Sequence, residues 1–105
     1  MYALLLALAL IVSPVPSLQL RKEYDASEAA ANVKYRGRRF EVVGKVEHLS
    51  ATYVIYLQGG VVARLTDKEI ARAGIIRVGF PIIIDCEGAG KVGEEPLLLE
   101  CRISS

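Results

Sequence analysis

The chain has 105 residues and a formal net charge of +1, from thirteen Lys or Arg and twelve Asp or Glu residues. This length is sufficient for one small domain. The charge balance excludes the strong basic excess that proteins specialised for nucleic acid usually carry. The hydrophobic fraction of 52% is raised by the first twenty residues, which contain no charged side chain. The remainder therefore has the composition of an ordinary globular domain.

An uncharged apolar segment opens the chain. Residues 4–12 (LLLALALIV) are all apolar, and Val15 and Ser17 are small residues that suit a cleavage point. A helix needs about twenty residues to span a bilayer, so this run is too short. We therefore expect residues 1–17 to be a signal peptide and residues 18–105 to be the mature domain. The alternatives are an uncleaved N-terminal anchor and a buried strand.

A short helix is predicted at the start of the mature domain. Asp25 and Glu28 have the spacing of a capping box in its acidic form, and the alanine-rich segment 28–34 favours a helix. Gly37 is placed to end it. Its thin apolar face predicts a helix that packs against a sheet.

Three strands are predicted next. Apolar residues alternate over residues 38–49, and Gly44 in the middle of this segment indicates a bulge or a sharp bend. Ser50–Ala51 is expected to be a two-residue turn. The second and third strands are predicted over residues 52–57 and 61–65, with a turn at residues 58–60.

A short helix and two further strands complete the predicted fold. Residues 66–69 (TDKE) match a capping box and Gly74 provides a stop, which predicts about two helical turns. Strands four and five are predicted over residues 78–86 and 96–103. Three strands, a short helix and two strands is the element order of the OB-fold, a five-stranded barrel. The predicted fold class is a mainly β OB-fold barrel with an additional N-terminal helix.

Cys86 and Cys101 are the two cysteines of the chain, and we expect them to form a disulfide. An even pair in a short exported chain is more often a bridge than a metal site. If Gly93–Glu94 is a two-residue hairpin loop, Cys86 lies directly opposite Cys101. The alternative is a pair of buried free thiols. With no CxxC spacing and one histidine, His48, we expect neither a metal site nor a cofactor.

No catalytic constellation is apparent, so we expect no enzymatic activity. The chain has no nucleophile-elbow motif, and its neighbouring carboxylates have no companion motif that would assign them to acid–base chemistry.

A basic strip is predicted on the outer face of the first three strands. With a two-residue turn at Ser50–Ala51, Lys45 faces Tyr56 on the outside, and the loop at 58–60 turns Arg64 outward. Together with Arg39 these side chains would offer cations and one aromatic platform, as single-stranded nucleic acid binding requires. The alternative is that the basic residues at 34–39 are a solvated junction between helix and strand.

Several short motifs are found between residues 25 and 103. They are Asn32, YRGR at 35–38, VVGKV at 42–46, Gly79, CEG at 86–88 and LECRI at 99–103. On these motifs the chain resembles the tRNA_anti-like family of bacterial OB-fold domains. The resemblance implies an OB-fold, nucleic-acid binding by relation to anticodon-binding domains, and a cysteine pair at the positions of Cys86 and Cys101.

The leading functional hypothesis is a monomeric binding module, periplasmic or secreted, whose ligand is a protein, an oligosaccharide or a small polar partner. One alternative is single-stranded nucleic acid binding through Arg39, Lys45, Tyr56 and Arg64. Another is a structural accessory that an uncleaved segment 1–17 tethers to the membrane.

Overall fold

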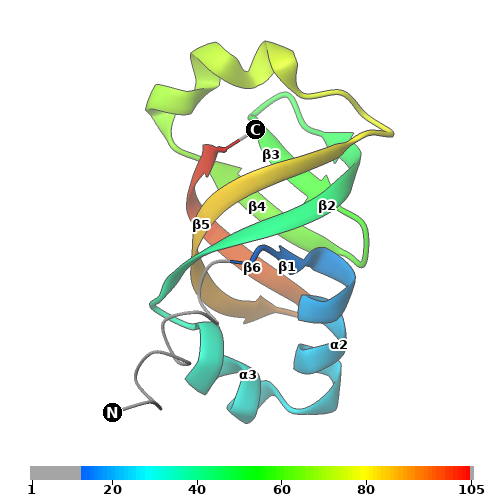
Figure 1. Ribbon diagram of the computed structural model, residues 1–105, viewed down its shortest axis with the longest axis vertical. Helices are drawn as coiled ribbons and strands as arrows, with labels where there is room; N and C mark the ends of the chain where they lie inside the picture. Colours follow the sequence, from blue (N-terminus) through cyan, green and yellow to red (C-terminus); the bar gives the residue numbers. More distant parts are fainter. Residues whose placement is uncertain (1–12, 105) are drawn as a thin grey trace.

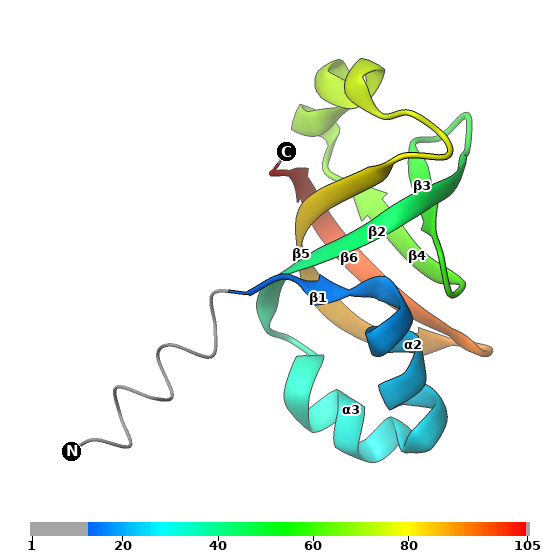
Figure 2. The same cartoon turned by 45° about the vertical axis from the view of Figure 1, so that its right-hand side comes forward.

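Five strands close into a barrel in the computed structural model, which describes residues 13–104 (Figures 1 and 2). The barrel strands are β2 (Arg39–Leu49), β3 (Val54–Leu57), β4 (Val61–Leu65), β5 (Pro81–Val92) and β6 (Glu95–Ile103). β2 pairs with both β3 and β5, and the parallel pairing of β4 with β6 completes the circuit. This is the OB-type arrangement that the sequence predicts, including a helical segment between the third and fourth barrel strands.

Alternate residues of the strands fill the barrel. In β4, Val61 and Ala63 are fully buried whereas Arg64 is exposed, so the predicted orientation of this strand is confirmed. The largest fully buried side chains of the barrel are Ile55, Leu57, Ile84, Leu98, Val42, Val46 and Val61. Their removal from water is the main contribution to folding.

Helical segments close the two ends of the barrel (Figure 1). At one end lies η1 (Asp67–Ile75), a 3-10 helix that buries Ala73. The predicted capping box at its start is wrong, because the Thr66 side chain makes no capping hydrogen bond. The Glu69 carboxylate instead accepts a hydrogen bond of 2.7 Å from the backbone N–H of Ile103. It therefore ties the helix to the last strand.

The other end is covered by two helices, α2 (Ser17–Ala26) and α3 (Glu28–Tyr35), where one was predicted. The N-cap of α3 is Ser27, whose hydroxyl accepts a hydrogen bond from Ala30 N–H, and Asp25 lies within α2. The helix signals recognised in the sequence, the acidic capping box and the alanine-rich run, lie at residues 25–34, and the helix over segment 17–26 was therefore missed. This helix buries Leu20 and Tyr24 in the core, and the two residues have the i, i+4 spacing of one helical face.

Polar contacts join α2 to α3. The Tyr35 hydroxyl donates to the Glu23 carboxylate at 2.7 Å, and the Tyr24 hydroxyl donates to Asn32 at 2.9 Å. Burial and the hydrogen bond to Glu23 raise the pKa of Tyr35, so its phenol stays protonated as a donor. Burial acts to raise the pKa of Glu23 as well, but hydrogen bonds from Gln19, Tyr35 and Lys34 outweigh it and lower that pKa. The helix pair is therefore held by a charged acceptor.

The first element that the structure describes is β1 (Val15–Pro16). It lies upstream of residue 18, where the domain was predicted to begin. β1 pairs in parallel with β2, and Val15 packs against the core. Residues 1–12, which hold most of the predicted leader, lie outside the described residues. Within residues 13–104, none of the helices has the length and apolar character that crossing a membrane requires.

Ser17 fixes the start of α2 to the barrel. Its side chain is buried, at 1% exposure, and its hydroxyl donates a hydrogen bond of 2.7 Å to the carbonyl of Gln58. Gly44 makes room for it, because a Cβ at position 44 would overlap the Ser17 hydroxyl. The bulge expected at Gly44 lies instead between Val46 and His48. The glycine is needed for close packing.

A chain that begins at Leu18 should be less stable than one that begins at Ser13. The shorter chain loses the β1 pairing, the packing of Val15 and the Ser17 hydrogen bond, which together should lower the free energy of unfolding by about 2 kcal/mol. Urea denaturation of both chains measures the difference. Coincident unfolding midpoints would contradict a structural role for residues 15–17.

Candidate binding groove beside the disulfide

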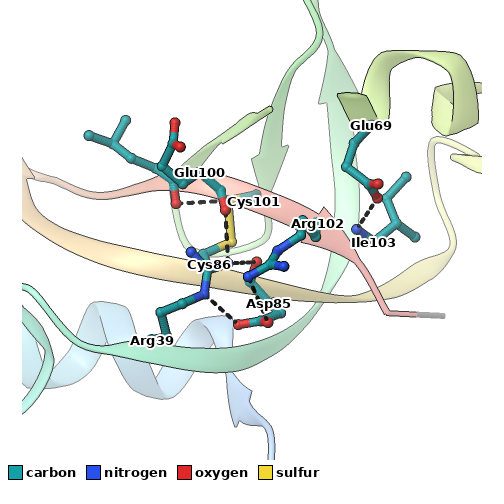
Figure 3. Close-up of a disulfide and its surroundings, with 9 residues drawn as sticks. Arg39, Glu69, Asp85, Cys86, Glu100, Cys101, Arg102 and Ile103 are labelled. Carbon is teal, nitrogen blue, oxygen red and sulfur yellow. Dashed lines mark hydrogen bonds and ion pairs between the residues drawn. A yellow bond between two sulfur atoms is a disulfide. The ribbon is translucent and has the colours of Figure 1, made fainter. Parts of the chain in front are cut away.

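A disulfide joins Cys86 in β5 to Cys101 in β6 (Figure 3). Both residues are fully buried and their Cα atoms lie 4.1 Å apart. The predicted bridge is confirmed, and the alternative of two free thiols is wrong. Because the bridge connects neighbouring antiparallel strands, it fixes the register at this point of the barrel.

Two bulges decide that register. The hairpin turns at Gly93–Glu94, as predicted. One bulge in β5, near Gly90, shifts the pairing by one residue. A second bulge in β6, at Glu100, shifts it back, so that Asp85 faces Arg102. The original register is therefore restored at the cysteines.

Glu100 adopts a φ of 52°, in the left-handed region that non-glycine residues rarely occupy. Such a bulge changes the direction in which neighbouring side chains point. Glu100 and Arg102, which flank Cys101, both project to the outer surface beside the bridge (Figure 3).

Arg39 reaches across from β2 to hold this part of the sheet. Its Nη2 donates hydrogen bonds of 2.9 Å to the carbonyl oxygens of Asp85 and Glu100. Its Nε lies 3.4 Å from the Asp85 carboxylate, which also lies 3.9 Å from Arg102 (Figure 3). The planar guanidinium suits several acceptors at once. Arg39 therefore positions β5 and β6 and is not a free cation.

A groove of about 700 Å³ opens over these residues. It lies where the end of β4, the first turn of η1 and the outer face of β6 meet. Its basic side chains are Arg39, Arg64, Lys68 and Arg102. Its acidic side chains are Asp67, Glu69 and Glu100, and Leu65 and Leu99 add apolar surface.

Only part of this charge is engaged within the protein. Glu69 is held by Ile103 N–H and by Arg72 at 3.2 Å, and Arg39 is held as described above. Among residues 13–104, no ion pair involves Arg64, Lys68, Asp67 or Glu100. These four side chains are available to a ligand, with Arg102 weakly held beside them. Together they can donate and accept several hydrogen bonds to a polar ligand.

The structure does not gather the predicted strip into one site. Arg39 and Arg64 both line the groove, whereas Lys45 and Tyr56 are not among its lining residues. In the part of the chain that the structure describes, no group of three or more His, Cys, Asp or Glu residues could hold a metal ion.

The predicted pairing of Lys45 with Tyr56 is wrong. The turn between β2 and β3 has four residues, 50–53, because the Ser50 hydroxyl accepts hydrogen bonds from the backbone N–H groups of Thr52 and Val54. The longer turn shifts the register, so that Tyr56 faces His48. The centroids of these two rings lie 5.5 Å apart.

The groove residues Lys68, Glu100 and Arg102 were missed by the sequence analysis. A bulge with a non-glycine residue at positive φ has no recognisable sequence pattern, so the direction of Glu100 could not be predicted. One available signal was proximity to the predicted disulfide, since Asp85, Glu100 and Arg102 are all chain neighbours of a cysteine.

Comparison with known proteins identifies the fold. No protein-family model matches the chain, and no curated protein sequence matches it. A solved structure from Klebsiella pneumoniae subsp. pneumoniae, a "putative nucleic acid-binding lipoprotein", is similar with a TM-score of 0.75 at 13% sequence identity. The match covers 94% of this chain and 96% of that chain. It supports the barrel fold, whereas membership of the tRNA_anti-like family stays a prediction.

Replacing Arg39 and replacing Arg64 should have different effects on stability. Arg39→Ala removes two hydrogen bonds from a charged donor and should lower the free energy of unfolding by about 2 kcal/mol. Arg64→Ala should change it by less than about 0.5 kcal/mol, because Arg64 is exposed and unpaired. Chemical denaturation of the two variants provides the comparison. Equal effects would refute the separation into a positioning arginine and a free one.

Proposed function

We propose that this protein is a non-catalytic binding module outside the cytoplasm that holds a polar ligand with carboxylate groups in the groove between β4, β6 and η1. The observation that carries the proposal is the convergence of Arg64, Lys68 and Arg102, from three different elements, on one groove. Arginine forms paired hydrogen bonds with carboxylates, and lysine adds a mobile positive charge.

The composition of the groove favours this ligand class over nucleic acid. No aromatic side chain lines it, so a base would find no stacking platform there. The free carboxylates of Asp67 and Glu100 would repel a continuous row of phosphates but can accept hydrogen bonds from hydroxyl or amide groups. A short acidic peptide or an acidic oligosaccharide supplies both kinds of group.

The buried disulfide supports a location outside the cytoplasm, because such bridges persist in oxidising compartments. We place the start of the mature domain upstream of Val15, since residues 15–17 are part of the fold. If the upstream segment with the apolar run at residues 4–12 is also retained, the same module would be tethered to the membrane.

Charge reversal in the groove tests the proposal. Oligoglutamate and oligogalacturonate serve as acidic probes, and their binding is measured by isothermal titration calorimetry at two salt concentrations. We expect Arg64→Glu combined with Arg102→Glu to weaken binding about tenfold or more, as loss of close charge pairs does. Lys22→Glu is the matched control, an exposed cation of α2 that lines neither the groove nor any other hollow described and that makes no ion pair within residues 13–104. Binding that Lys22→Glu weakens equally, or no binding of either probe, would contradict the proposal.

A second candidate is single-stranded nucleic acid binding on the outer face of β2 and β3. Two observations favour it, the paired rings of His48 and Tyr56 and the described role of the Klebsiella protein. These rings are tilted by 40° to each other, and aromatic rings on an outer face can each support a base.

Titration with a fluorescent single-stranded oligonucleotide tests this candidate. Tyr56→Ala should reduce affinity about fivefold or more, since base stacking on an aromatic ring contributes about 1–3 kcal/mol. The affinity should also fall as salt rises. An affinity that is unaffected by Tyr56→Ala, or that does not depend on salt, would eliminate the candidate.

A further inference from the structure

A second unpartnered surface lies at the end of the barrel opposite α2 and α3, in the segment that joins η1 to β5 (Figures 1 and 2). Ile75, Val78 and Phe80 are 56%, 58% and 61% exposed. Together with Arg77 we call them the turn patch. A cluster of exposed large apolar side chains often marks an interaction site, whereas isolated ones are common on protein surfaces.

The turn patch is held rigidly. Phe80 N–H donates to the carbonyl of Arg77 at 3.1 Å, closing a tight turn in which Gly79 has a φ of 93°. Val46 of β2 then fastens this turn twice, accepting from Gly79 N–H at 2.7 Å and donating to the Phe80 carbonyl at 3.0 Å. Since the backbone is already ordered, a partner would bind without the entropic penalty of ordering a loop.

A hollow of about 220 Å³ lies beside the exposed side chains. Its apolar lining is Ile75, Ile76, Phe80, Pro81 and Ile82, and the remaining lining residue is Arg77. A hollow of this kind has room for an inserted side chain and offers a guanidinium at its edge.

The charges around the hollow indicate the kind of partner. Arg77 makes no ion pair within residues 13–104, and neither does Lys45, which faces Pro81 across the β2–β5 ladder. A partner that supplies a carboxylate next to its inserted side chain would complement this charge. Arginine and phenylalanine are also the residue types enriched at the centres of protein–protein interfaces.

We propose that the turn patch is a docking surface for a partner protein that inserts an apolar side chain into the hollow and places a carboxylate against Arg77. A hollow of about 220 Å³ suits a single apolar side chain, and a protein segment can carry a carboxylate next to that side chain. The surface shares no residue with the groove, so it constitutes a second binding site and does not depend on the proposed ligand of the first.

The test uses ¹⁵N-labelled protein, residues 13–105, and three synthetic ten-residue peptides that alternate Leu with Glu, Leu with Lys, and Ser with Glu. We expect amide shifts over residues 75–82 with the Leu–Glu peptide, and shifts at least about fivefold weaker with the other two. Arg77→Glu should invert the preference, so that the Leu–Lys peptide binds better. Phe80→Ser should abolish binding.

Two matched variants control for nonspecific binding of peptides to exposed apolar side chains. Val33→Ser and Val92→Ser alter apolar residues outside the patch that are more exposed than those within it, at 76% and 65%. Both should bind the Leu–Glu peptide like the unmodified protein, and all variants should keep the dispersed spectrum of a folded domain. Equal binding of the Leu–Glu and Leu–Lys peptides would overturn the proposal. So would shifts at residues 75–82 with vesicles of phosphatidylglycerol and phosphatidylcholine but not with peptide, an outcome that would assign the patch to lipid.

Discussion

The disulfide-linked pairing of β5 with β6 is the constraint on which the rest of the structure depends. A domain with about ninety ordered residues buries too little apolar surface to be very stable on that account alone. A bridge across a sequence separation of 15 residues contributes about 3 kcal/mol in the loop-entropy model. Here the bridge also holds the strand pair whose second member, β6, closes the barrel against β4. The covalent link and the closure of the sheet therefore reinforce each other.

Arg39 connects a third strand, β2, to this linked pair. By donating to backbone carbonyls of both β5 and β6, it adds hydrogen bonds between the strands at the bulge, where the regular pairing is interrupted. The bulge in turn directs polar side chains toward the groove. Arg39 and Glu100 thus belong both to the contacts that stabilise the sheet and to the candidate groove, which is why the groove lies beside the bridge.

The sequence was sufficient to predict the elements that follow simple periodicity. The alternation in residues 61–65, the turn at Gly93–Glu94 and the pairing of Cys86 with Cys101 depend on local signals, and all three are confirmed. The predicted turn length and bulge position were wrong where a serine side chain determines the local backbone structure. Ser50 lengthens a turn and Ser17 occupies the space left by Gly44, and neither effect is visible as a pattern of apolar residues.

The same distinction explains why only part of the predicted basic strip, Arg39, Lys45, Tyr56 and Arg64, was placed correctly. Its outward orientation followed correctly from strand alternation for Arg64, but the association of Lys45 with Tyr56 required a turn length that Ser50 alters. Because side chains alternate with a period of two, a register shift of two residues keeps a side chain on its face but gives it different cross-strand neighbours.

The positions of the two surfaces bear on how the protein could work. η1 contributes Lys68 to the groove through its first turn and Ile75 to the turn patch through its last residues, so one helix connects both. Glu69 and Arg72 anchor that helix to Ile103, two residues from the bridge.

Any ligand that displaced Glu69 from Ile103 would therefore disturb both surfaces, whereas one held by Arg64 and Arg102 would leave η1 in place. Because Glu69 is only 12% exposed and Arg64 lies on the open surface, the second mode requires less rearrangement. The contacts of η1 thus favour independence of the two candidate surfaces over coupling between them.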